Sequence, residues 1–210
     1  TWADKSVSDS NIQIEGYTLF RQDRGSKKAG GGLAIYIKNN LKVTFLNELS
    51  FVTQHDFQLQ WIKVQCRSFK TFIICNVYRP PSTPIKHCID IMSNCFMDVF
   101  LSNLDIVILG DLNCNLMCSI NSDANLLREF MSIFNLNQLI NKPTRITDLS
   151  QSLIDVIMTN NNSLVSFHDV LSCSISDHDL VYAVLSLKTP RAKPKYISTR
   201  TTILVNFLMT

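Results

Sequence analysis

Polar residues suited to acid–base chemistry directly follow an apolar run near the middle of the sequence. The run from Asp105 to Leu109 predicts a buried strand, because it is too short for a helix. Gly110, Asp111 and Asn113 come next, and in extended backbone residues two apart point to the same side. A carboxylate and an amide are therefore predicted to lie side by side, with Gly110 allowing a tight turn before them. An ordinary strand-to-loop turn would also use Gly, Asp and Asn.

Asp155 places a second carboxylate inside an apolar run, and His178 precedes the last such run. Apolar residues stand on both sides of Asp155, so its charge would be costly unless it is paired. If Asp155 accepts a hydrogen bond from a ring nitrogen of His178, the pair fixes the tautomer and stabilises the imidazolium. A purely structural Asp–His pair, or a turn formed by Ser176 and Asp177, is the alternative interpretation.

These polar residues share predicted positions at or near strand ends, where layered α/β folds tend to bind ligands. They are Asp111, Asn113, Asp155, Asp177 and His178. Tyr78 and Arg79 add a hydroxyl and a guanidinium at the end of another strand. Oxygen ligands with one histidine suit a hard cation such as Mg²⁺ and phosphate chemistry, whereas zinc would need more His or Cys.

Apolar periodicity predicts the elements that position these groups. Strands are expected over residues 33–37, 57–66, 72–77, 105–109, 153–158 and 181–187. The phase of the apolar positions switches within residues 57–66, which indicates a bulge or burial on both faces. Helical spacing predicts amphipathic helices over residues 85–100 and 126–134. Because strands occur both in succession and separated by helices, the pattern favours a layered α/β sandwich.

Length and composition predict one globular domain. The 210 residues are 46% hydrophobic and 18% charged, and the net charge of +3 permits a polyanionic partner without requiring one. Residues 1–188 are expected to form the domain, with residues 189–210 as a proline- and lysine-rich linker and a frayed tail. Seven cysteines without a CxxC pair predict free thiols in a reducing compartment. No stretch of eighteen apolar residues occurs, so no membrane span is expected.

Five motifs in order resemble a known superfamily. YRPP at 78–81, GDLN at 110–113, LNQLINKPTR at 136–145, LID at 153–155 and SDH at 176–178 are similar to the endonuclease/exonuclease/phosphatase superfamily. More narrowly, they resemble the apurinic-type endonuclease domain of non-LTR retrotransposons. The resemblance spans residues 1–188, and the order and spacing of the motifs carry it.

The resemblance implies a fold, an activity and partners. The fold would be a four-layer α/β sandwich of two mixed β-sheets flanked by helices. The activity would be Mg²⁺-dependent hydrolysis of a DNA phosphodiester, leaving a 3′-hydroxyl that primes reverse transcription at the target. The domain would stand at the N-terminus of a polyprotein that carries reverse transcriptase, in the nucleus or cytoplasm.

The resemblance also implies roles for the catalytic residues. Asp111 would orient or deprotonate the attacking water, and Asn113 would hydrogen-bond water and phosphate. His178, held by Asp155, would stabilise charge on the phosphoryl oxygens. Tyr78 would contact the scissile phosphate. This agrees with phosphoryl transfer, which needs positioning and charge stabilisation more than covalent help.

Metal and substrate binding are expected from a second group of residues. Asp177 would serve the metal, and Arg79 and Arg145 would bind substrate. A polar, glycine-rich loop from Asp23 to Gly32 is expected to bring Lys27 and Lys28 to the surface.

The departures from the family leave alternatives open. Family members carry an asparagine on a first strand and a metal-binding glutamate. Here that glutamate would immediately precede Thr1, so Thr1 is interpreted as a cut end, with the first strands outside the chain. One alternative is a retroelement remnant that binds DNA without cutting it. Another is a superfamily phosphatase or apurinic repair enzyme.

Overall fold

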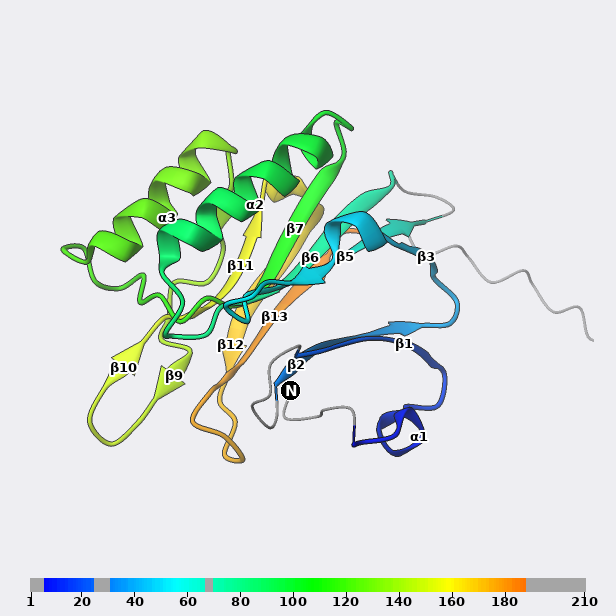
Figure 1. Ribbon diagram of the computed structural model, residues 1–210, viewed down its shortest axis with the longest axis horizontal. Helices are drawn as coiled ribbons and strands as arrows, with labels where there is room; N and C mark the ends of the chain where they lie inside the picture. Colours follow the sequence, from blue (N-terminus) through cyan, green and yellow to red (C-terminus); the bar gives the residue numbers. More distant parts are fainter. Residues whose placement is uncertain (1–5, 25–30, 67–69, 188–210) are drawn as a thin grey trace, which may run out of the picture.

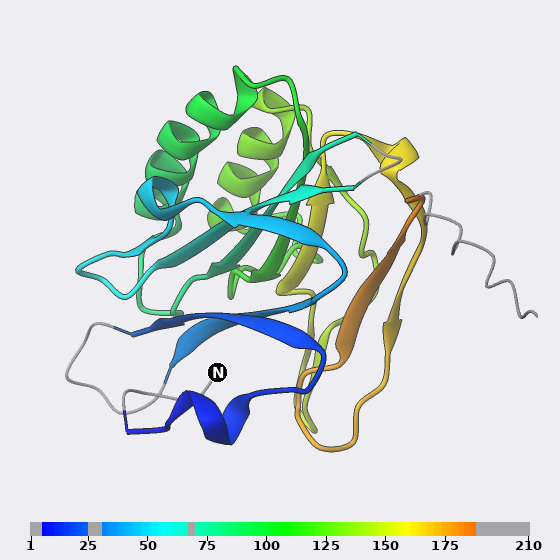
Figure 2. The same cartoon turned by 90° about the vertical axis from the view of Figure 1, so that its right-hand side faces the viewer.

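The structure is a computed structural model, and it describes residues 6–24, 31–66 and 70–187. Lys27, Lys28 and the predicted linker and tail at 189–210 lie outside the described residues. The described chain forms a central mixed sheet with helices on one face and β-hairpins on the other (Figures 1 and 2). The predicted layered α/β sandwich is therefore confirmed.

The central sheet has the strand order β3-β5-β6-β7-β11-β8, with β4 paired to β5. Its strands are β3 (Lys42–Phe45), β4 (Phe51–Val52), β5 (Gln58–Gln65), β6 (Phe72–Tyr78), β7 (Asp105–Asp111), β8 (Asn137–Gln138) and β11 (Asp155–Thr159). β6 and β7 run parallel, and the other pairs are antiparallel. A parallel pair needs a long crossover, which here contains helix α2 (Ile85–Phe100).

Helices α2 and α3 (Ser122–Ile133) cover one face of the sheet (Figure 1). Their apolar faces meet the sheet through four aromatic rings whose contacting centroids lie 5.1 to 5.5 Å apart: Trp61, Phe96, Phe130 and Phe134. Aromatic pairs at such distances add to the stabilisation from burial. Helix α3 begins before its predicted start, because Asn121 caps it by accepting hydrogen bonds from the backbone of Asp123 and Ala124.

Two antiparallel hairpins lie over the opposite face, as Figure 2 shows. One pairs β1 (Tyr17–Asp23) with β2 (Gly32–Lys38), and the other pairs β12 (Val165–Leu171) with β13 (Leu180–Leu185). They form separate two-stranded sheets in the described residues. Apolar residues of the sheet pack beneath them, including Ile62, Val64, Phe72, Val107 and Ile157.

Short elements complete the described chain. They are α1 (Asp9–Ile12), η1 (Asn47–Leu49), η2 (Asn162–Leu164), β9 (Arg145–Ile146) and β10 (Gln151–Ser152). All seven cysteines are free thiols, as predicted. Within the described residues, no helix has both the length and the apolar content needed to cross a membrane.

The predicted strands and helices are all present, although some boundaries differ and further strands were not predicted. The strand expected at 153–158 begins at Asp155, so this carboxylate lies at a strand start and is half-buried, not inside the core. The phase switch in residues 57–66 reflects burial on both faces, because β5 pairs with β6 in an unbroken register. Sequence periodicity did not reveal β1, β3 or β12, none of which contains a buried residue.

Candidate active site

A row of polar residues crosses four strands at one end of the hairpin-covered face. Gln58 of β5 is paired with Tyr78 of β6, and Tyr78 is paired with Asp111 of β7. Asp111 is in turn opposite Asp155 of β11. Because paired residues on adjacent strands project from the same face, these four side chains lie next to one another. The strand register alone therefore brings distant motifs together.

A pocket of about 560 Å³ lies over this row, between the sheet and the hairpins. The polar side chains that line it come from both layers: Arg24, Asn76, Tyr78, Asp111, Asp155, Ser176, Asp177 and His178. Five of the eight residues predicted to form the site therefore share one pocket. Asn113, Arg79 and Arg145 are not among its lining residues.

Asp155 and His178 form the hydrogen-bonded pair that the sequence predicts. His178 Nδ1 lies 2.9 Å from Asp155 Oδ2, and the two side chains are 31% and 15% exposed. Thr144, which is fully buried, binds the backbone segments that carry Asp155 and His178. Its hydroxyl accepts hydrogen bonds from the backbone N–H groups of Ile154 and Asp155, and its carbonyl accepts one from Asp179. The imidazole is thus fixed at the pocket edge by its carboxylate partner.

Asp111 and Asn113 lie side by side, but not through extended backbone. Asn113 has φ +46°, and its backbone N–H donates to Asp111 Oδ1 at 2.8 Å. Its side-chain amide donates to Asp111 Oδ2 at 3.0 Å and to the carbonyl of Arg79 at 2.8 Å. The amide therefore holds Asp111 in place, whereas the sequence prediction gave it contacts with water and phosphate.

Burial raises the pKa of Asp111 from 3.8 to about 6. The hydrogen bond from the Asn113 backbone opposes this rise, the negative charge of Asp155 adds to it, and the charges of His178 and Arg79 oppose it. A carboxylate with such a pKa is ionised at neutral pH and still accepts a proton more readily than an ordinary one. Asp111 is therefore suited to act as a general base.

Gly110 is required by close packing and not by the tight turn that the sequence suggested. It lies within β7 at φ +146°, and a Cβ built at this position would be 1.8 Å from the carbonyl oxygen of Val77. The absent side chain lets β7 approach β6. Tyr78 is thereby held directly opposite Asp111.

Arg79 corrects a second expectation, because its guanidinium does not face the pocket. The residue is 3% exposed, and its Nε, Nη1 and Nη2 donate to the backbone carbonyls of Leu112, Thr83 and Asn113. Because its buried guanidinium donates hydrogen bonds to these backbone carbonyls, Arg79 positions the loop that follows β7. Its predicted role in substrate binding does not fit this geometry.

Asp177 and Arg145 are bound to each other. Arg145 Nε lies 2.8 Å from Asp177 Oδ2, and both side chains are exposed. The Arg145 hydrogen bond lowers the pKa of Asp177. Asp177 still lines the pocket, whereas Arg145 is not among its lining residues. The predicted metal residue is therefore at the site but already neutralised by a neighbour.

Sequence analysis missed three polar residues near the pocket. Arg24 lines it, and an ion pair connects Arg24 to Asp56. Gln58 is fully buried, and neither atom of its amide has a hydrogen-bond partner among the described residues. The available signal for Arg24 was its place as a basic residue within the polar, glycine-rich segment from Asp23 to Gly32. Tyr78, which lines the same pocket as Arg24, has a raised pKa, mainly because of burial.

The donor atoms of Asp111, Asp155 and His178 lie within 4.8 Å of one another. Two carboxylates and one imidazole form a donor set that accepts a divalent cation, and oxygen donors favour a hard one. The cluster does not include Asp177, the residue that the sequence predicted to bind the metal. It fits a divalent metal on the chemistry of its donors.

The family comparison adds to this geometry. Residues 72–182, more than half of the chain, match the family described as endonuclease–reverse transcriptase. The chain belongs to the endonuclease–reverse transcriptase family. The matched segment contains YRPP, GDLN, LID and SDH, so the predicted membership of the endonuclease/exonuclease/phosphatase superfamily is confirmed. No curated protein matches the sequence.

Solved structures show that this endonuclease–reverse transcriptase family member has the fold of the superfamily. The endonuclease domain of TRAS1, a telomere-specific non-LTR retrotransposon, matches with a TM-score of 0.69 and 16% identity, over 84% of this chain and 83% of that one. The 3′ phosphatase NExo from Neisseria, bound to a product DNA hairpin, gives 0.62 and 16%, over 89% and 86%. A family protein from Bacteroides thetaiotaomicron gives 0.58 and 17%, over 83% and 75%.

Proposed function

We propose that this chain is the Mg²⁺-dependent DNA endonuclease domain of a non-LTR retrotransposon. It would nick target DNA by hydrolysing a phosphodiester and leave a 3′-hydroxyl for target-primed reverse transcription. The observation that supports this most is the placement of Asp111 and the Asp155–His178 pair in one pocket. The endonuclease–reverse transcriptase family match and the TRAS1 fold agree with a nucleic-acid phosphodiester as substrate.

Asp111 and His178 would divide the acid–base work. Asp111, whose pKa burial raises to about 6 in the metal-free site, would orient the attacking water and accept its proton. His178, oriented by Asp155 through Nδ1, would stabilise the charge that develops on the phosphoryl oxygens. Tyr78, which lines the same pocket, would contact the scissile phosphate.

Carboxylate oxygens of Asp111 and Asp155 would hold the cation, with Asp177 on the same pocket wall as a further donor. When bound, Mg²⁺ supplies positive charge next to the phosphate. The charge of a cation would also lower the pKa of Asp111 and offset the repulsion between the two carboxylates.

The larger protein would supply the second activity. Residues 1–188 would form the nuclease domain, and residues 189–210 would connect it to reverse transcriptase in the same polyprotein. The proposed substrate places the protein's action in the nucleus, after synthesis in the cytoplasm.

Conversion of supercoiled plasmid to nicked circle in Mg²⁺ tests the proposal. His178→Ala is expected to lower nicking by roughly 10²- to 10⁴-fold while DNA binding stays unchanged, because the ring stabilises charge in the transition state. His168→Ala is the matched control, because His168 is an exposed histidine of β12 that does not line the pocket. Equal nicking by wild type and His178→Ala would contradict the role of His178.

The alternatives give different outcomes in the same assays. A superfamily phosphatase would release inorganic phosphate from a 3′-phosphorylated oligonucleotide and leave the plasmid supercoiled. A remnant without catalytic function would be folded and bind DNA, yet neither nick plasmid nor release phosphate.

A further inference from the structure

A pocket that binds a phosphodiester is expected to contain a positive side chain. The two arginines that the sequence predicted for this role bind other groups of the protein. Arg79 donates to backbone carbonyls, and Arg145 is paired with Asp177. Among the described residues that line the pocket, Arg24 is the one lysine or arginine. The described walls otherwise carry three carboxylates and one imidazole, which disfavour an anion at neutral pH.

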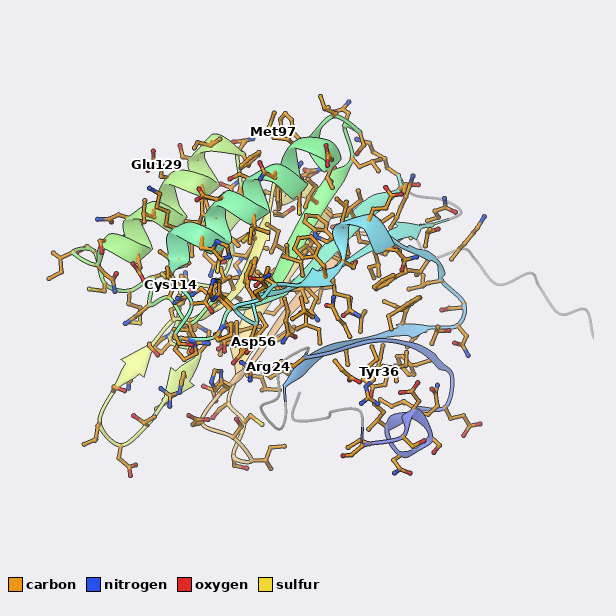
Figure 3. All side chains as sticks on the ribbon, viewed as in Figure 1. Arg24, Tyr36, Asp56, Met97, Cys114 and Glu129 are labelled. Carbon is orange, nitrogen blue, oxygen red and sulfur yellow. The ribbon has the colours of Figure 1, made fainter. Side chains whose placement is uncertain are left out.

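We propose that Arg24 binds the phosphate that enters the pocket and that Asp56 positions it for this purpose, an inference that rests on the proposed nuclease function. Arg24 follows the last residue of β1, so the first hairpin delivers it to the pocket from the side opposite the central sheet. Figure 3 shows Arg24 and Asp56 next to each other.

The ion pair with Asp56 holds Arg24 through only one edge of its guanidinium. Nε lies 3.3 Å from Asp56 Oδ2, and the side chains are 16% and 14% exposed. Nε is buried and has no hydrogen-bond partner among the described residues. A planar guanidinium has five N–H donors in a fork that matches two phosphate oxygens. Asp56 therefore limits the position of the group without a hydrogen bond to Nε.

Gly31 provides the space that the guanidinium occupies. A Cβ built on Gly31 would lie 3.0 Å from Arg24 Cδ and 3.2 Å from Nη1, so the arginine packs against a position without a side chain. Gly31 has φ +97°, a conformation that favours glycine. Gly31 thus leaves space for Arg24 at the pocket.

Arg24 is also close enough to act on the tyrosine of the site. Burial raises the pKa of Tyr78, the positive charge of Arg24 lowers it, and the negative charges of Asp111 and Asp56 raise it. Arg24 and Tyr78 therefore approach the same region of the pocket. A phosphate there would contact a guanidinium and a hydroxyl on one side and the Asp155–His178 pair on the other.

The test is DNA binding without cleavage, measured on a short duplex in EDTA at several salt concentrations. Arg24→Gln is expected to raise Kd about tenfold, the effect of losing one charge-assisted hydrogen-bonding group. It is also expected to reduce the slope of log K against log salt by about 0.9, the loss of one phosphate contact. Lys42→Gln is the matched control, because Lys42 is exposed and paired with Gln65, at the end of β5 far from Gln58.

A second variant guards against a structural effect of removing a partly buried charge. Arg24→Lys keeps the positive charge but loses the planar pair of guanidinium donors. It should therefore restore the slope of log K against log salt and only part of the affinity for DNA. Asp56→Asn should raise Kd less than Arg24→Gln and leave the slope unchanged. Wild-type Kd and slope in both Arg24 variants would overturn the proposal. A wild type that binds DNA with the predicted Arg24 dependence but never nicks would instead refute the nuclease function alone.

Discussion

The two faces of the central sheet are formed by alternate residues of the same strands, yet they differ in chemistry. Beneath the helices, Leu59, Val77 and Ile108 belong to a continuous apolar core. Beneath the hairpins lie the adjacent residues of the same strands, Gln58, Tyr78 and Leu109. Gln58 and Tyr78 are polar and belong to the row at the pocket. Because adjacent strand residues point to opposite faces, one sequence segment can serve both faces independently.

The cover of each face explains the difference. Helices α2 and α3 lie against their face with an aromatic cluster. The hairpins instead leave a pocket of about 560 Å³ above the polar row. We therefore expect the helix-covered face to determine stability and the hairpin-covered face to determine activity.

Asp155→Ala gives the largest expected effect on the hairpin-covered face. It removes the partner of His178 Nδ1, and nicking should fall by roughly 10³-fold because the ring loses its orientation. The backbone of residue 155 keeps its hydrogen bond to Thr144, so the melting temperature should change little. Plasmid nicking and a thermal melt check the two expectations. Wild-type nicking would show that another group orients His178.

Phe96→Ala tests the helix-covered face. Phe96 is fully buried and contacts the rings of Trp61, Phe130 and Phe134, so its truncation should cost about 3 to 5 kcal/mol of unfolding free energy. Urea denaturation measures the loss. Met97→Ala, at an exposed position on the same helix, is the control and should cost far less. A similar loss in both variants would contradict the proposed division between faces.

Asp111→Asn should show that the polar row lowers stability. Folding raises the pKa of Asp111 from 3.8 to about 6, so the ionised carboxylate destabilises the fold. This penalty is absent below pH 3.8, grows as pH rises to about 6 and is complete above it. The variant should therefore gain about 3 kcal/mol over wild type at pH 8 and less than about 1 kcal/mol at pH 4. Thermal melts without metal at both pH values check the sign, and an equal gain at both would refute it.

Local patterns were sufficient to predict the elements that bury one whole face. The spacing of apolar residues in residues 85–100 and the nearly unbroken apolar run at 72–77 predicted α2 and β6, because both patterns are set by neighbours in sequence. The Asp155–His178 pair was also predicted, because an isolated charge in an apolar run needs a partner.

Residues whose direction depends on tertiary structure were not predictable in this way. Whether Arg79 faces a pocket or nearby carbonyls depends on the path of the loop at Leu112 and Asn113. Arg24 reaches the pocket only because the first hairpin folds over the sheet. Gly110 looked like a turn residue because sequence does not show how closely β6 approaches β7.

Thr144 gives the Asp155–His178 pair a common anchor. One side chain bonds the start of β11, and its own carbonyl bonds the backbone next to His178. The two halves of the pair therefore share a reference point, although 23 residues separate them in sequence. Because Asp155 belongs to the central sheet and His178 to the loop between β12 and β13, Thr144 connects that loop to the sheet and resists separation of the imidazole from its carboxylate. A single buried threonine thus links the second hairpin to the central sheet at the Asp155–His178 pair.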